Sequence, residues 1–196
     1  MSLELIIGPM FAGKSSALQS IVRRRMAIGW NVLVIKHGID VRYLSQYEEN
    51  NVIVNHDQMR CPAKPCTNLL SCFEWSSFND AKLIVIEEGQ FFEDIVLFVT
   101  RAVESFGKHV VVVGLDGDAH RKPFGQILNL IPLADEVHRI YALCKMCGDG
   151  TPARFTSAIS ADILDITSDG KPNIGASESY QPTCRKHFLE CYNKIL

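Results

Sequence analysis

The chain has 196 residues, of which 47% are hydrophobic, so it can bury the core of one full domain and at most a small appendage. Its formal net charge of −2 gives no reason to expect nucleic acid as a partner. The apolar runs are too short to span a bilayer and the amino terminus lacks the pattern of a signal peptide, so we expect a cytoplasmic protein without a membrane partner. In that compartment the seven cysteines are expected to be thiols or metal ligands.

A glycine-rich loop lies between a predicted strand over residues 3–7 and a predicted helix over residues 16–28, which ends near Gly29. A glycine, four residues and then glycine-lysine-serine is the spacing of a phosphate-binding loop. Its glycines let backbone N–H groups point at a polyphosphate, the lysine adds a charge, and the serine offers a hydroxyl to Mg²⁺. The predicted phosphate-binding residues are Gly8, Pro9, Met10, Phe11, Ala12, Gly13, Lys14 and Ser15.

The next part of the chain gives weaker signals. A second buried strand is predicted over residues 31–36, followed by a polar loop over residues 37–60. Two prolines between Cys61 and Cys66 favour a plain turn there over a metal site. A short helix is predicted over residues 68–73.

A third apolar strand, over residues 82–86, ends in the acidic pair Glu87 and Glu88. An acidic side chain at the tip of a buried strand is expected to face the magnesium ion in a phosphate-loop protein. A helix is predicted over residues 93–106, and a fourth strand over residues 109–114. The turn-rich segment of residues 115–125 follows that strand, where it can form a wall for a ligand, and a fifth strand is predicted over residues 137–143.

Two close pairs of metal-binding side chains lie near the carboxyl terminus. Three cysteines and one histidine suit a tetrahedral zinc site of the structural, closed type, and free surface thiols are the alternative. Such an ion would hold the ends of the intervening segment together and do no chemistry. The predicted zinc ligands are Cys144, Cys147, Cys184 and His187.

Taken together, these motifs resemble the type II thymidine kinases over nearly the whole chain. Besides the phosphate loop and the cysteine pairs, the resemblance rests on Asp40-Val41-Arg42-Tyr43, Glu88-Gly89-Gln90-Phe91-Phe92, Leu115-Asp116-Gly117, Arg121-Lys122-Pro123-Phe124-Gly125, Phe155-Thr156, Ile174-Gly175 and Tyr180. It implies an α/β fold: a RecA-like phosphate-loop core with a mainly parallel sheet over residues 1–143, and a zinc-binding lasso subdomain over residues 144–191.

The resemblance also implies a reaction, the phosphorylation of thymidine, and of deoxyuridine as a second substrate, at the 5′-hydroxyl by ATP with Mg²⁺. Glu88 would be the general base, Lys14 and Arg42 would assist the transfer, and Ser15 and Glu87 would hold Mg²⁺. Gln90 is assigned to the cofactor side of the site. The residues implied to contact the nucleoside are Met10, Leu115, Phe124, Thr156, Ile174, Gly175 and Tyr180.

Members of this family are commonly homotetramers with a structural Zn²⁺, and thymidine triphosphate is expected as a feedback inhibitor. The chain departs from the family pattern at Glu87, where aspartate is usual, and at His187, where a fourth cysteine is usual. Ala119 stands where many members have phenylalanine, which predicts a wider base pocket and an altered base preference as an alternative. Ala158 replaces a common basic residue.

Without the resemblance, the residues predict a magnesium-dependent nucleotide-binding enzyme with a zinc-stapled loop. The rival from another class is a nucleic-acid-dependent ATPase with the same core, in which the zinc module binds a strand. The near-neutral charge and the lack of a basic platform with interleaved aromatic residues argue against it.

Overall fold

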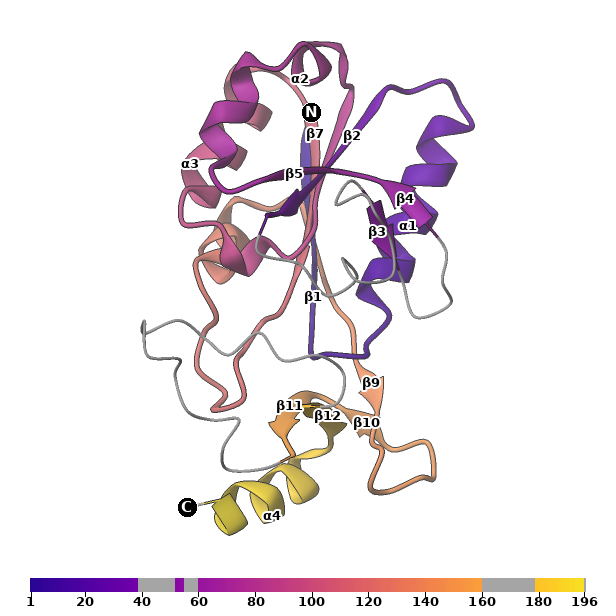
Figure 1. Cartoon of the computed structure of the whole chain (residues 1–196), viewed down its shortest axis with the longest axis vertical. Coiled ribbons are helices and arrows are strands. Elements are labelled where there is room, and N and C mark those ends of the chain that lie inside the picture. Colours follow the sequence, from indigo (N-terminus) through magenta and orange to yellow (C-terminus); the bar gives the residue numbers. More distant parts are fainter. Residues whose placement is uncertain (39–51, 55–59, 160–178, 196) are drawn as a thin grey trace. The chain divides into compact units, whose positions relative to one another are not determined.

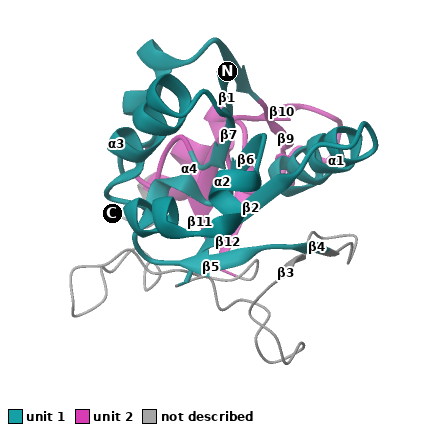
Figure 2. Cartoon of the chain, turned by 90° about the horizontal axis from the view of Figure 1, so that it is seen from above, with its two compact units in different colours: residues 1–7, 14–115, 124–139 teal, residues 8–13, 116–123, 140–196 magenta. Residues whose placement is uncertain are grey.

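The computed structural model describes residues 1–38, 52–54, 60–159 and 179–195. Two compact units are distinguished by their internal contacts (Figure 2). The first comprises Met1–Ile7, Lys14–Leu115 and Phe124–Arg139, and the second comprises Gly8–Gly13, Asp116–Pro123 and Ile140–Leu196. The expected division at residue 143 does not coincide with these units, because three short segments of the expected core, residues 8–13, 116–123 and 140–143, make their contacts within the second unit.

The first unit is built on a six-stranded sheet in the order β5-β2-β6-β7-β1-β8. All five neighbouring pairs are parallel, which confirms the α/β fold class. The central strands are buried on both faces, as their continuous apolar runs predict. The strands are β1 (Ser2–Ile7), β2 (Val32–His37), β5 (Lys64–Cys66), β6 (Leu83–Ile86), β7 (His109–Gly114) and β8 (Glu136–Arg139).

Helices cover both faces of this sheet, with α1 (Lys14–Met26) on one side and α3 (Ile95–Thr100) on the other (Figure 1). The core on the α3 side contains Leu5 and Val112, which are paired across neighbouring strands, together with Phe98. The helix predicted over residues 93–106 is confirmed, although its second half, η3 (Arg101–Ser105), is a π-helix. The remaining helices of this unit are η1 (Leu69–Glu74), α2 (Ser76–Asp80), η2 (Gly89–Phe91) and η4 (Ile127–Leu133).

Two expectations for this part of the chain are wrong. Residues 61–66 do not form a turn but lie largely in two short strands, β4 (Arg60–Pro62) and β5. Within the loop expected over residues 37–60, Val52–Val54 forms β3, which pairs antiparallel with β4, and residues 39–51 and 55–59 lie outside the described residues. Pro65 is tolerated in β5 because this strand lies at the edge of the six-stranded sheet, where one row of N–H groups needs no partner.

The strand predicted over residues 137–143 is in fact two strands. Glu136–Arg139 forms β8 at the edge of the large sheet, whereas β9 (Ala142–Leu143) pairs antiparallel with β10 (Pro152–Ala153). The apolar residues of this stretch do not predict the break between the two strands. All four residues of β8, including Val137, are exposed, so an apolar residue here does not mark a buried strand.

The described residues of the second unit form short antiparallel strand pairs and one helix. Besides β9 and β10, β11 (Phe155–Ala158) pairs with β12 (Tyr180–Thr183), and α4 (Arg185–Ile195) follows directly. Its small core contains Ala142, Cys144 and Ala153, with Phe11 packed against them. Among the described residues of both units, no helix is long and apolar enough to cross a membrane.

Candidate active site and metal centre

Two residues of the glycine-rich loop have a left-handed backbone. Phe11 and Gly13 have φ angles of 64° and 80°, in the left-handed region. Such residues turn neighbouring backbone N–H groups toward a common side, which makes a concave site for an anion. The 13-residue helix α1 begins at Lys14, with no acidic side chain in its first turn to compete with a bound anion.

Thr156 holds this loop from β11. The backbone N–H of Met10 donates a hydrogen bond to the Thr156 hydroxyl oxygen, at 3.0 Å. Only 6% of Thr156 is exposed. Met10 and Thr156, which were both expected to contact the nucleoside, are therefore in contact with each other. They are 146 positions apart, so no local pattern in the sequence predicts this contact.

Ser15 and Glu87 are joined by a hydrogen bond within the first unit. The Ser15 hydroxyl donates to Oε1 of Glu87 at 2.8 Å, and Glu87 is only 4% exposed. The backbone N–H of Glu87 donates to the carbonyl of Ile35 at 2.9 Å, which fixes the residue at the end of β6. A hydroxyl and a carboxylate are oxygen ligands of the kind that Mg²⁺ prefers, so the pair fits the expected magnesium site.

Glu88 has a strained backbone, with a φ angle of 53° in the left-handed region. A residue with a side chain pays about 1–2 kcal/mol for this conformation, and such strain is concentrated at functional sites. Nε2 of Gln90 donates to Oε2 of Glu88 at 2.6 Å. The structure thus places Glu88 beside Glu87, at the carboxyl end of a central parallel strand, where ligand sites of such sheets are found.

The predicted nucleoside residues of the first unit are Leu115 and Phe124. The backbone N–H of Leu115 donates to Oε1 of Gln90 at 3.0 Å. The Phe124 ring meets that of Phe91 edge to face, with centroids 5.4 Å apart. Sequence reasoning assigned Gln90 to the cofactor but missed that its amide bridges Glu88 and Leu115.

The turn that contains Ala119 is closed by its own side chains. Oδ1 of Asp118 accepts the backbone N–H groups of His120, at 2.9 Å, and of Lys122, at 2.8 Å. The His120 ring meets the ring of Tyr192 in α4 edge to face, with centroids 6.1 Å apart. The ring that His120 contacts is therefore in α4.

Three residues that the sequence assigned to the site lie outside the described residues: Arg42, Ile174 and Gly175. Tyr180 is described at the start of β12, half-buried and paired with Ala158 across the β11–β12 ladder. Burial raises the pKa of the Tyr180 phenol, and the nearby carboxylate of Asp118 raises it further.

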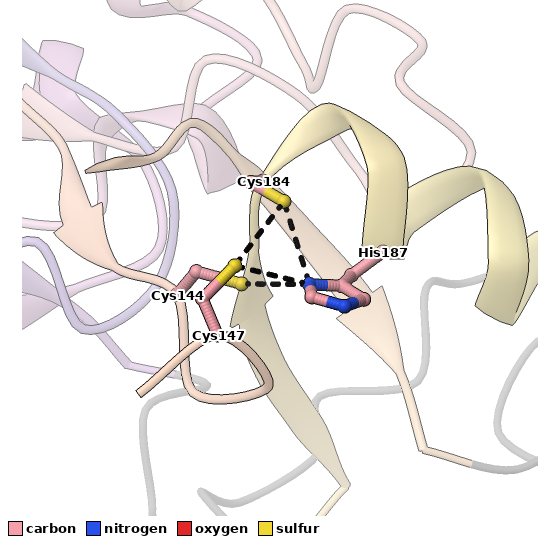
Figure 3. A group of neighbouring side chains, drawn as sticks. All are labelled: Cys144, Cys147, Cys184 and His187. Carbon is pink, nitrogen blue, oxygen red and sulfur yellow. Dashed lines mark hydrogen bonds between the residues drawn. The ribbon is translucent and has the colours of Figure 1, made fainter. Parts of the chain in front are cut away.

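The four predicted zinc ligands converge on one point (Figure 3). Nδ1 of His187 lies 3.4 Å from Sγ of Cys144, 3.3 Å from Sγ of Cys147 and 3.5 Å from Sγ of Cys184, and the last two sulfurs are 3.8 Å apart. Tetrahedral zinc with ordinary bond lengths requires about 3.8 Å between two sulfurs and about 3.6 Å between sulfur and nitrogen. The side chains therefore fit a structural zinc ion.

Local structure brings these ligands together from three elements. Cys144 and Cys147 flank a turn after β9, closed by a hydrogen bond from the Gly148 N–H to the Cys144 carbonyl, at 3.1 Å. Cys184 precedes α4 and His187 lies in its first turn. Although burial opposes it, hydrogen bonds from the backbone of Cys184 and Cys147 lower the pKa of the Cys144 thiol to about 6, which favours the thiolate that zinc binds. Nε2 of His187 lies 3.9 Å from Oε2 of Glu190, which is too far for a hydrogen bond.

Comparison with known proteins identifies the family of this chain. The family model described as "Thymidine kinase" matches residues 1–188. The chain belongs to the thymidine kinase family. Thymidine kinase a of Arabidopsis thaliana is 34% identical, over 96% of this chain and 75% of that protein.

Viral thymidine kinases match over more of their own length. The thymidine kinase of Vaccinia virus (strain Western Reserve) is 38% identical, over 96% of this chain and 97% of that protein. That of Yaba monkey tumor virus is 39% identical, over 98% of this chain and 95% of that protein. A solved structure of a DNA replication initiation factor aligns over 71% of this chain and 40% of its own, with a TM-score of 0.42 and 9% identity, too weak a likeness to support an argument.

Proposed function

We propose that this protein transfers the γ-phosphoryl group of ATP to the 5′-hydroxyl of thymidine, with deoxyuridine as a second substrate. The observation that carries the proposal is the family match over residues 1–188, which spans both units of the fold. Most of the residues assigned to the reaction lie within the described part of the chain.

The phosphates of ATP are bound by the backbone amides of residues 8–13 and by the ammonium group of Lys14. Ser15 and Glu87 hold Mg²⁺ through the hydroxyl and the carboxylate that already lie 2.8 Å apart. When bound, the ion neutralises charge on the phosphates during transfer. Arg42 is assigned to stabilise the same negative charge on the phosphates, because of its place in the family motif.

Glu88 acts as the general base and takes the proton from the 5′-hydroxyl as that oxygen attacks the γ-phosphate. Its strained backbone and its short hydrogen bond to Gln90 support this role, because catalytic carboxylates must be held in one orientation. The nucleoside base is assigned to Met10, Leu115 and Phe124. The lasso contributes the remaining contacts, from Thr156, Ile174, Gly175 and Tyr180.

Ala119 supports a second candidate, a deoxynucleoside kinase with a broader base preference. Alanine at position 119 offers less area for packing against the base than phenylalanine would. Packing discriminates only weakly between bases, whereas polar groups of the site that a wrong base would leave unpaired discriminate strongly. Feedback inhibition by thymidine triphosphate and a homotetrameric assembly are part of the proposal by family membership.

The proposal is tested by a coupled turnover assay with ATP and Mg²⁺ against thymidine, deoxyuridine, deoxycytidine, deoxyguanosine and deoxyadenosine, with single-stranded DNA as a further arm. We expect turnover with thymidine and deoxyuridine only. Turnover with several bases would favour the second candidate. ATP hydrolysis that responds to DNA and to no nucleoside would overturn the kinase assignment.

The role of Glu88 is tested by Glu88→Gln in the same assay. Removing a general base typically lowers turnover by about two to four decades, and we expect a loss in that range with ATP binding nearly unchanged. Unchanged turnover would remove Glu88 from the mechanism while leaving the thymidine kinase assignment intact.

A further inference from the structure

The side chain of Gln90 is bonded at both ends of its amide. Nε2 donates to Oε2 of Glu88 at 2.6 Å, and Oε1 accepts the backbone N–H of Leu115 at 3.0 Å. Only 3% of the residue is exposed. One buried amide thus joins the carboxylate of the proposed base to the first residue after β7.

Glycines on neighbouring segments leave room for this bridge. A Cβ atom at Gly114 would overlap Oε1 of Gln90, and a Cβ atom at Gly125 would overlap its backbone carbonyl oxygen. The backbone therefore approaches Gln90 closely at two positions, one on each side of the segment between β7 and η4. In such a tightly packed site the amide keeps a single orientation.

The bridge needs a donor and an acceptor on one side chain of this length. Glutamate at position 90 would keep the acceptor for Leu115 but would oppose the carboxylate of Glu88 with a second carboxylate. Methionine would fill a similar volume and offer no strong hydrogen bond to either partner. Since Glu88 also holds a left-handed backbone, a second contact is needed to fix where its carboxylate points.

We propose that Gln90 is a positioning residue for phosphoryl transfer: its amide sets the orientation of the Glu88 carboxylate and ties that carboxylate to the backbone of Leu115. This inference rests on the proposed role of Glu88 as the base. It differs from an assignment of Gln90 to the nucleotide cofactor, because Gln90 then acts on turnover through Glu88 and leaves ATP binding largely unaffected.

The test is a double-mutant cycle on the full chain with Glu88→Gln, Gln90→Met and the two combined, in which kcat and the KM values for thymidine and ATP are measured. Misplacing a catalytic group by about 1 Å can cost about a hundredfold, so we expect Gln90→Met to lower kcat by about ten- to a hundredfold with the KM for ATP within about twofold of its original value. In the Glu88→Gln background the same change should have almost no further effect on kcat, because residues that act as a unit are not additive.

Gln126→Met is the matched control, since Gln126 is exposed and precedes η4. It should leave all three constants unchanged. Gln90→Glu keeps the length and the acceptor for Leu115, and it should also lower kcat; it replaces the methionine variant in the cycle if that variant does not fold.

Three results would overturn the inference: an unchanged kcat in the Gln90 variants, an equal fold-loss in both backgrounds, or a loss confined to the KM for ATP. Its failure is distinguishable from failure of the proposed function. Thymidine turnover by the unaltered chain tests the function, Glu88→Gln alone tests the base, and the cycle tests the coupling between the two residues.

Discussion

Single residues after β6 and before η4 have conformations or contacts that tolerate little change. Glu88 has a left-handed backbone at the end of β6, and Gly125 has a φ angle of 59° where the chain passes the Gln90 backbone. Gly107 has a similar φ angle, 65°, but nothing lies within 4 Å of a Cβ atom built there. The two glycines therefore separate the cost of backbone conformation from the cost of close packing.

We expect Gly107→Ala to lower the free energy of unfolding by about 1 kcal/mol, the cost of a left-handed alanine. Gly125→Ala has that cost and an overlap with the Gln90 carbonyl as well, so its loss should be larger by about 1–3 kcal/mol. Urea denaturation monitored by circular dichroism gives both values. Equal losses would mean that the chain around Gly125 moves freely and does not constrain Gln90.

The described strands of the second unit are too short to be stable by themselves, since they contain only two to four residues. Its buried apolar side chains include the small Ala142 and Ala153, and Phe188 of α4, which is 1% exposed. Elements of this size usually need a metal or a disulfide to stay folded. Arg121 adds a cation–π contact from the loop of residues 116–123 to Phe188 of α4, with its guanidinium 4.6 Å from the ring centroid.

The proposed metal site, which joins these short elements, can be tested with two substitutions at position 187. His187→Ala removes one ligand and should lose most of the one zinc ion expected per chain, with a raised KM for thymidine because α4 and the lasso ends are no longer held. His187→Cys restores a four-thiolate set, which zinc accepts equally well, and should keep the metal. Elemental analysis by mass spectrometry measures the zinc content. Full zinc content in the alanine variant would contradict the assignment of His187 as a ligand.

The two units of the molecule depend on different sources of stability. The first has a large apolar core that extends from β1 to η4, whereas the second has a three-residue buried cluster, Ala142, Cys144 and Ala153, that includes one of the proposed zinc ligands. Metal binding adds directly to folding free energy where no large core exists. The two units should therefore respond differently when the metal is withdrawn.

Removal of zinc by a chelator should speed amide hydrogen exchange in β9–β12 and in the first turns of α4, and leave β1, β6 and β7 protected. Exchange reports local opening, which depends on the stability of each cooperative unit. Hydrogen–deuterium exchange mass spectrometry with and without chelator makes the measurement. A uniform rise in exchange would show that the chain unfolds as one unit held by the metal.

Local patterns in the sequence were sufficient to predict several features. The continuous apolar runs predicted the buried parallel strands, because a strand covered on both faces needs no polar alternation. The motif from Gly8 to Ser15 predicted a loop between a strand and a helix, which the structure has between β1 and α1. The two close pairs ending at His187 predicted the four side chains that the structure brings together. In each case the signal lies in residues a few positions apart.

Tertiary structure alone decided the features that depend on distant partners. The break between β8 and β9 depends on which sheet each strand joins, and the Gln90 bridge to Leu115 spans 25 positions. The hydrogen bond from Met10 to Thr156 likewise has no counterpart in local sequence. The residue type determines which hydrogen bonds a side chain can donate or accept. Its partner is the group that the folded chain brings within about 3 Å, and only the fold determines which group that is.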